Sequence, residues 1–199
     1  MLEKFRDAGI RDFLVSLHGI GDIHDQVRKV KRGFDKACQT IDALDALARE
    51  YDNFQFGIAA TIFATNMEDA RNILAWSRER NLDIVFNMLR FTDAMLGNRE
   101  LEGTIRLKTQ EEEFMRQFFL EQVAEESVLS GQAFQYLHYA DMIANGYVRT
   151  MPCPFRTQGL LLNPDGTLFY CENAKPLGNI LDTPAGDLYF DAGHLADRA

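Results

Sequence analysis

Three short runs of apolar residues mark the first half of the chain, and apolar and polar residues do not alternate strictly within them. The runs cover residues 12–17, 54–63 and 82–89 and are rich in Val, Ile, Leu and Phe. Short continuous runs of this kind are typical of strands that are buried on both faces of a parallel sheet. We therefore predict three buried strands at these positions.

Between these runs, apolar residues recur every three or four positions, which is the spacing of one face of a helix. A helix is predicted between the first two strands, with its apolar stripe at Phe34, Ala37, Cys38, Ile41, Leu44 and Ala48. Another is predicted after the second strand, with Asn66 as its N-terminal cap and an apolar stripe that ends near Ser77. A shorter helix is expected over residues 2–8, where Gly9 stops it.

The resulting order is strand, helix, strand, helix, strand, which predicts an α/β fold. Connections of this kind make the strands parallel and the crossovers right-handed. Residues 10–90 are therefore expected to form either half of a TIM-type (β/α) barrel or three strands of an open, doubly wound sheet. Periodicity alone does not separate these two architectures.

The pattern changes to paired helices over residues 91–150, which are predicted to form a helical extension. The first of its main helices is expected to begin at a capping box formed by Thr109 and Glu112, and the second to end at Gly146. Aromatic residues with helical spacing are expected to pack in the core of this part, and they are Phe114, Phe118, Phe119 and Phe134.

Residues 151–199 are predicted to form a small separate module built on a β-hairpin. The runs 159–163 and 167–171 flank Asn-Pro-Asp-Gly, which has the residues of a tight hairpin turn. Cys153 and Cys171 lie on either side of this turn, so we expect the hairpin to bring them near one end of a two-stranded ribbon. A disulfide, a zinc site and a pair of iron-sulfur ligands all remain open at this point.

Composition narrows the choice of compartment and partner. The chain is 46% hydrophobic and 26% charged, which is typical of a globular protein, and its net charge of -9 argues against nucleic acid as a partner. No apolar run approaches the roughly 20 residues of a membrane helix, so no membrane partner is expected. The N-terminal residues lack the apolar stretch of a secretory signal, so we predict a cytoplasmic location. In a reducing compartment, a cysteine pair is more often a metal or redox site than a disulfide.

The first helical unit carries a family resemblance. The first strand ends in Val-Ser-Leu-His-Gly, and His-Asp, an arginine and Gly-Phe-Asp follow it. Residues 13–44 thereby resemble the fourth strand and the following helix of radical S-adenosylmethionine enzymes, except that His18 stands where the family frequently has aspartate. The resemblance implies that residues 1–90 form the carboxy-terminal half of that family's partial barrel.

A second resemblance comes from the hairpin module. Cys153, twelve residues, Gly166, four residues and Cys171 form a spacing that resembles the opening of the SPASM or twitch module of the same superfamily. This implies that Cys153 and Cys171 bind an auxiliary four-iron four-sulfur cluster. The family's Cys-x-x-x-Cys-x-x-Cys motif does not occur in the sequence, so we expect this chain to be the carboxy-terminal part of a longer enzyme and inactive alone.

The resemblance also implies roles for residues near the strand ends. Ser16 is expected to hydrogen bond with S-adenosylmethionine, and Arg28 to pair with the carboxylate of this cofactor. His18 and Thr61 are expected to line the same pocket. The implied partners are a peptide or small-molecule substrate and an electron donor such as flavodoxin or ferredoxin.

Other interpretations of the same residues remain open. The chain can be a non-catalytic α/β binding module whose cysteine hairpin holds zinc or binds a peptide, or an unrelated α/β barrel enzyme that uses carboxylates and His18. Structural roles are expected for three residues: Cys38 in the core, and His24 and Asp25 in shaping the loop that leads to the helix at Phe34.

Overall fold

The computed structural model describes residues 2–91, 97–125, 130–150, 159–171 and 174–198 of the 199-residue chain. The chain divides into two compact units. Unit 1 comprises residues 1–89 and 105–136, and unit 2 comprises residues 90–104 and 137–199. The segment predicted as a helical extension, residues 91–150, is thus shared between the units. Among the described residues, no helix is both long enough and apolar enough to cross a membrane.

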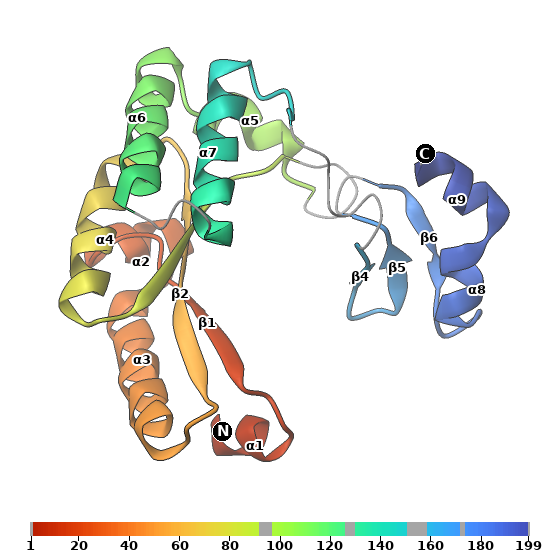
Figure 1. Cartoon of the computed structure of the whole chain (residues 1–199), viewed down its shortest axis with the longest axis horizontal. Helices are drawn as coiled ribbons and strands as arrows, with labels where there is room; N and C mark the ends of the chain where they lie inside the picture. The colour runs from red at the N-terminus through yellow and green to blue at the C-terminus, as the bar shows by residue number, and fades with distance from the viewer. Residues whose placement is uncertain (1, 92–96, 126–129, 151–158, 172–173, 199) are drawn as a thin grey trace. The chain divides into compact units, whose positions relative to one another are not determined.

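Unit 1 is built on a three-stranded parallel sheet with the order β1-β2-β3 (Figure 1). The strands are β1 Asp12–Ser16, β2 Gln55–Ile62 and β3 Asp83–Met88. All three predicted strands and their parallel direction are confirmed, and with them the α/β class. The sheet is open, so the half-barrel interpretation goes beyond what these strands show and stays a proposal.

Two crossover helices connect these strands. Helix α3, Gly33–Glu50, joins β1 to β2, and α4, Ala70–Glu79, joins β2 to β3. Each contacts the two strands that it connects, as expected for right-handed crossovers that place both helices on one face of the sheet (Figure 1). The other helical segments are α1 Leu2–Asp7, α2 Asp22–Arg28, η1 Met67–Asp69, η2 Arg99–Leu101, α5 Glu102–Ile105, α6 Thr109–Glu125 and α7 Gly131–Ala144.

The core of unit 1 lies between the sheet and these helices. Side chains on the same face of neighbouring strands are buried together, among them Leu17, Ile58, Ala60, Ile62, Ile84 and Phe86. Ile41 and Leu44 of α3 and Ile73 of α4 are buried as well, as the helical periodicity predicted. Because side chains alternate along a strand, Leu14 and Ser16 lie on the opposite face of the sheet.

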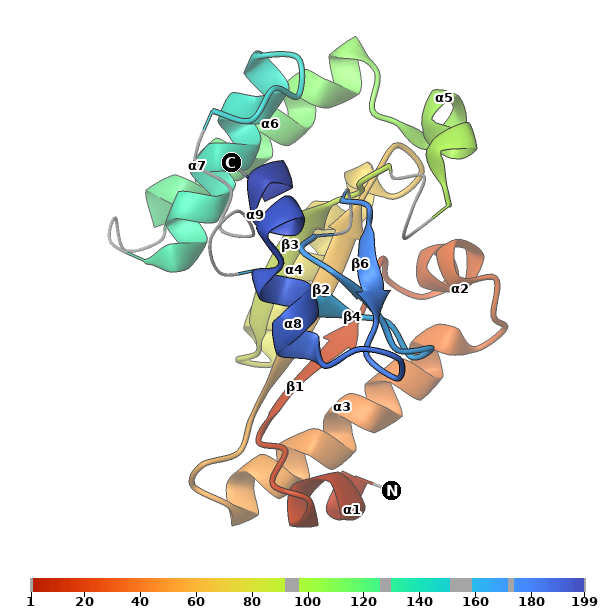
Figure 2. The same cartoon turned by 90° about the vertical axis from the view of Figure 1, so that its right-hand side faces the viewer.

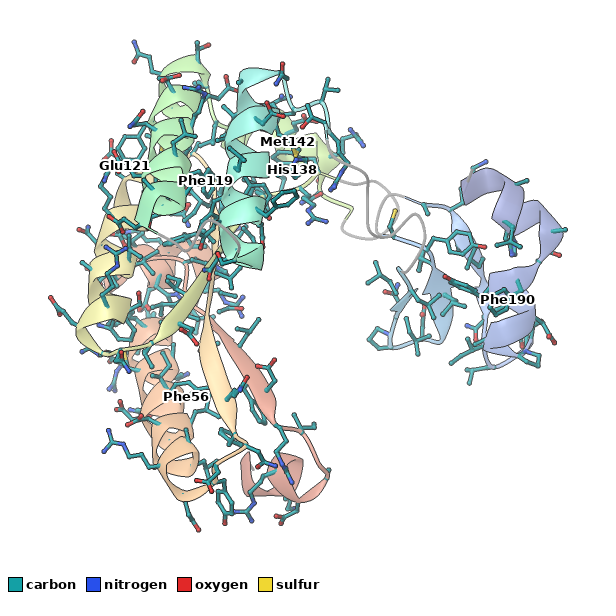
Figure 3. The ribbon with its side chains drawn as sticks, viewed as in Figure 1. Phe56, Phe119, Glu121, His138, Met142 and Phe190 are labelled. Carbon is teal, nitrogen blue, oxygen red and sulfur yellow. The ribbon has the colours of Figure 1, made fainter. Side chains whose placement is uncertain are left out.

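Aromatic rings join α6 and the first half of α7 to the sheet. The ring of Phe118 lies edge-on to that of Phe86 with centroids 5.0 Å apart, and Phe119 stacks on Tyr136 at 5.6 Å. Figure 3 shows Phe119 pointing from α6 toward α7. The predicted core positions are confirmed for Phe118 and Phe119, which are fully buried. The prediction is wrong for Phe134, which is 61% exposed because it lies on the outer side of α7.

Two predicted helix caps differ from the structure. Asn66 precedes η1, but its side chain makes no capping hydrogen bond with that helix. Helix α6 begins at Thr109 itself, and it is the carboxylate of Glu111 that accepts a hydrogen bond from the backbone N–H of Lys108, at 2.7 Å. The positions of the helices were therefore predicted more accurately than the hydrogen bonds at their ends.

Unit 2 contains a three-stranded antiparallel sheet of β4 Leu161–Leu162, β5 Thr167–Phe169 and β6 Pro176–Asn179. Helices α8 Ala185–Phe190 and α9 Ala192–Arg198 follow β6 in the chain (Figure 2). Strands β4 and β5 confirm the predicted hairpin, and Gly166 in its turn has a φ of 89°, which favours glycine. Strand β6 was not predicted, and it pairs with β5.

Candidate functional site

Polar side chains gather where β1 and β2 end. We call His18, His24, Asn66 and Asp69 the strand-end cluster, since the first two follow β1 and the last two follow β2. His24, Asn66 and Asp69 are buried, and His18 is half-buried. The carboxyl ends of parallel strands are the usual place for ligand sites in α/β folds. The hydrogen bonds within the cluster therefore determine which of its polar groups remain available to bind a ligand.

Asn66 holds the two strand ends together. Its Nδ2 donates to the backbone carbonyl oxygens of His18, at 2.7 Å, and Thr61, at 2.9 Å. Its Oδ1 accepts from the backbone N–H of Phe63, also at 2.9 Å. Three backbone groups from two segments thus depend on one buried side chain.

The two histidines serve as acceptors in the same cluster. The backbone N–H of Thr61 donates to Nδ1 of His18, and the backbone N–H of His18 donates to Nδ1 of His24, both at 3.1 Å. A ring that accepts at Nδ1 while neutral carries its proton at Nε2. Burial, with smaller contributions from Arg28 and His24, lowers the pKa of His18 from 6.5 to about 4. Burial, followed by the charge of Arg28, also lowers the pKa of His24.

The lowered pKa of His18 predicts that unit 1 is less stable at acidic pH. The folded state disfavours protonation of His18, so its contribution to stability is complete above pH 6.5 and is lost as the pH falls from 6.5 toward 4. The expected loss in the free energy of unfolding is about 2 kcal/mol, after a reduction for the part of the ring that remains in contact with solvent. Urea unfolding at a series of pH values measures it. A His18→Gln variant should lose this part of the pH dependence and a His194→Gln variant should keep it; an unchanged profile in His18→Gln would contradict the assignment.

Asp69 and Asp25 anchor the loops around the cluster. The carboxylate of Asp69 accepts from the backbone N–H of Ile20 and from the side chain of Asn72. That of Asp25 accepts from the backbone N–H groups of Arg32 and Phe34, at 2.5 and 2.8 Å, and these hydrogen bonds, first of all the one from Phe34, lower the pKa of Asp25. The predicted loop-shaping role of Asp25 is confirmed.

A cavity of about 420 Å³ runs beside β1, between the strand and helices α2 and α3; we call it the edge cavity. Its polar lining comes from Ser16, His24, Arg28, Lys36 and Thr40. Its apolar lining comes from Phe13, Leu14, Val15, Val30, Ala37 and Leu44, together with Gly33. A cavity with an apolar wall and a few polar groups has the character of a small-molecule site.

Of the four residues predicted to bind the cofactor, two line this cavity and two do not. Ser16 and Arg28 both line it, and both are exposed. His18 and Thr61 bond to each other in the strand-end cluster. Neither Arg28 nor Lys36 forms an ion pair with a carboxylate of the described residues, so both cations remain available for an anionic group.

The predicted cluster ligands lie in unit 2. Cys171 follows β5 and is half-buried, whereas Cys153 falls outside the described residues. The pairing of β4 with β5 ends at Leu161 and Phe169, so the expected meeting of the two thiols depends on a segment that is not described. Cys38, expected in the core, is half-buried on α3, and burial raises the pKa of its thiol. Within the described ranges, no group of three or more potential metal ligands comes together.

His138 is a residue that the sequence pattern did not single out. It lies on α7 in unit 2, is 7% exposed, and neither of its ring nitrogens has a hydrogen-bond partner in the described part of the chain. Burial lowers its pKa, with a smaller contribution from Arg149. A buried histidine without partners is unusual, but nothing in the local sequence distinguishes it from a core position.

The chemistry available in unit 1 is therefore recognition of an anionic group by Arg28 and Lys36 beside an apolar wall. The ends of β1 and β2 next to it are joined by hydrogen bonds. Unit 2 offers one described thiol, at Cys171. Comparison with known proteins adds no relative, since no family model, no curated protein and no solved structure matches the chain.

Proposed function

We propose that the chain is the carboxy-terminal part of a radical S-adenosylmethionine enzyme with an auxiliary iron-sulfur module. In this proposal unit 1 contributes part of the S-adenosylmethionine pocket and unit 2 contributes ligands of the auxiliary cluster. The substrate is a peptide or a small molecule, and a protein such as flavodoxin or ferredoxin supplies electrons. The half-barrel architecture is part of the same proposal.

The observation that carries the proposal is the position of Ser16 and Arg28 on one cavity at the end of a parallel strand. Ligands of α/β proteins bind at the carboxyl ends of such strands. The volume of about 420 Å³ is within the range of about 300 to 1,000 Å³ that is usual for small-molecule sites. The family resemblance of residues 13–44 supports the same two residues independently of the cavity.

The donor set of the edge cavity fits S-adenosylmethionine. A guanidinium forms a two-pronged hydrogen bond with a carboxylate, so Arg28 would hold the methionyl carboxylate of the cofactor. The hydroxyl of Ser16 would bond with a ribose hydroxyl or the methionyl group. The strand-end cluster would hold β1 and β2 in place next to the bound cofactor. When bound to a reduced catalytic cluster, the cofactor supplies a 5'-deoxyadenosyl radical in this family.

The auxiliary cluster fits only in part. A four-iron four-sulfur cluster takes about four thiolate ligands. The chain has three cysteines, and Cys38 belongs to unit 1 whereas Cys153 and Cys171 belong to unit 2. Two ligands would therefore come from this chain and the others from residues outside it.

Calorimetric titration of the 199-residue chain with S-adenosylmethionine tests the proposal. We expect binding without turnover, and a rise of about tenfold or more in the dissociation constant for Arg28→Ala, since this variant loses a charge-assisted hydrogen bond. Lys31→Ala is the matched control, because Lys31 belongs to the same loop region but does not line the cavity. No binding, equal binding by the Arg28→Ala variant, or cleavage of the cofactor by this chain alone would contradict the proposal.

A second candidate function is a peptide-binding module without catalysis. Unit 2 exposes large apolar side chains, among them Leu162, Leu181 and Phe190. Exposed apolar groups of this size are found at protein interaction sites. This function requires neither S-adenosylmethionine nor the thiols, so failure of the titration would favour it.

A further inference from the structure

One ring nitrogen of His24 has a hydrogen-bond partner among the described residues, and the other has none. Nδ1 accepts from the backbone N–H of His18 at 3.1 Å. Burial and the charge of Arg28 lower the pKa of His24 below 6.5, so the ring is neutral at pH 7 and carries its proton at Nε2. The side chain is only 3% exposed, and donors this deeply buried are normally hydrogen bonded. The Nε2–H group is therefore a donor that the described part of the chain leaves for another partner.

The Nε2 side of this ring borders the edge cavity. His24 and Gly33 both line the cavity. A Cβ atom at Gly33 would lie 3.4 Å from Cδ2 of His24, which is the ring carbon bonded to Nε2. The Nδ1 side of the ring is directed to the backbone of His18 instead. Of the two ring nitrogens, Nε2 is thus the one next to the lining of the cavity.

Helix α2 brings Arg28 to the same cavity. His24 and Arg28 are four positions apart on this helix, a spacing that places two side chains on one helical face. Both residues line the cavity. Arg28 forms no ion pair with a carboxylate of the described residues. One turn of α2 therefore offers a permanent cation and a neutral N–H donor on the same side of the cavity.

The surroundings of the cavity favour an anionic ligand. Residues 28–36 contain five lysines and arginines and one aspartate, although the net charge of the chain is -9. The aspartate, Asp35, forms an ion pair with Arg32. None of the described residues that line the cavity is acidic. Clustered charge of one sign raises the local concentration of ligands of the opposite sign.

We propose that His24 is a ligand-binding residue of the edge cavity, and that its Nε2–H donates to the carboxylate of an organic acid that Arg28 also binds. One cation and one neutral donor match the single charge and the two oxygens of a carboxylate. The apolar wall, which includes Val15 and Leu44, receives the apolar part of the acid. That this acid is S-adenosylmethionine rests on the proposed function. The role of His24 applies to any organic carboxylate that the cavity admits.

Nitrogen-15 NMR of the native chain tests this role without a substitution. The chain has four histidines, so spectra of the histidine-labelled protein report the proton position and the hydrogen bonding of each ring separately. Benzoate should shift the Nε2 resonance of His24, and its Nδ1 resonance should remain that of an acceptor. Benzamide is the matched control ligand, because it has nearly the same shape without the charge, and it should cause no shift. The resonances of His194 in unit 2 should not respond to either compound.

Two substitutions separate the roles of the two ring nitrogens. His24→Asn keeps an acceptor near the position of Nδ1 but has no group at Nε2, so the dissociation constant for the carboxylate should rise about tenfold. His24→Gln keeps a donor near Nε2 but loses the acceptor, so this constant should change by less than about threefold although the protein becomes less stable. A purely structural role of His24 predicts the opposite order. His194→Asn is the matched control, and circular dichroism verifies that each variant is folded.

S-adenosylmethionine and its decarboxylated analogue identify the source of the carboxylate. A shift of the His24 resonance with S-adenosylmethionine and none with the analogue would support both proposals. A shift with benzoate but no binding of S-adenosylmethionine would support the role of His24 and contradict the proposed function. Binding of S-adenosylmethionine without a response at His24 would overturn the role of His24 and leave the proposed function standing. This role would also be overturned by the absence of a shift with every carboxylate, by an equal shift with benzamide, or by unchanged affinity in His24→Asn.

Discussion

Replacing Phe118 with alanine is expected to destabilise unit 1 by about 4 kcal/mol, the largest effect of any substitution considered for this chain. Phe118 is fully buried, and its ring lies edge-on to Phe86 at 5.0 Å and to Phe119 at 5.7 Å. Truncation removes both contacts and leaves a cavity where α6 meets the sheet. Urea unfolding monitored by tryptophan fluorescence measures the loss, since the only tryptophan, Trp76, lies on α4 in unit 1.

Phe134→Ala is the matched control for this measurement. Both residues are phenylalanines on neighbouring helices of unit 1, but Phe134 is 61% exposed. Its truncation should change the free energy of unfolding by less than about 0.5 kcal/mol. Similar losses in the two variants would show that α6 and α7 do not pack as described.

The second large effect is expected at the strand-end cluster, where Asn66→Ala should cost about 3 kcal/mol in the free energy of unfolding. The substitution removes three hydrogen bonds and leaves the carbonyl groups of His18 and Thr61 and the N–H of Phe63 without this partner. Burial makes the loss large, because water does not readily replace a partner in the interior. The same fluorescence measurement reports it.

Two further variants make this test specific. Asn53→Ala changes an exposed asparagine before β2 and should have an effect below about 0.5 kcal/mol. Asn66→Asp keeps the oxygen that accepts from Phe63 but places a carboxylate against two carbonyl oxygens, so it should destabilise at least as much as alanine. If Asn66→Asp were as stable as the native chain, the donor role of the side chain would be refuted.

The strand-end cluster has a consequence for the proposed cofactor pocket. His18 occupies the position where the family that residues 13–44 resemble frequently has aspartate, and its Nδ1 accepts from the backbone N–H of Thr61. The imidazole thus extends the contact between β1 and β2 beyond their last paired residues, Ser16 and Ala59. Of the four residues predicted to bind the cofactor, Ser16 and Arg28 are the two that line the edge cavity.

The α/β class, all three parallel strands and the crossover helices were predictable from the order of residues alone. Their signals are local, because burial on both faces selects apolar runs and one-sided burial selects a spacing of three to four residues. The hairpin of unit 2 was predictable for a similar reason, since Asn163, Pro164, Asp165 and Gly166 each favour a turn through their own backbone preferences.

Only the tertiary structure determined which segments that are distant in the sequence interact. The sequence suggested that Asn66 caps a helix, but its side chain bonds with His18, which is 48 positions away. Helical spacing put Phe134 in the core, although the partners of α7 leave that side of the helix exposed. The hydrogen bonds of Gln132 and Tyr136 with the backbone of β3 likewise depend on where α7 lies. Local sequence patterns indicate which residues are buried. The packing of the whole unit determines which groups each buried residue contacts.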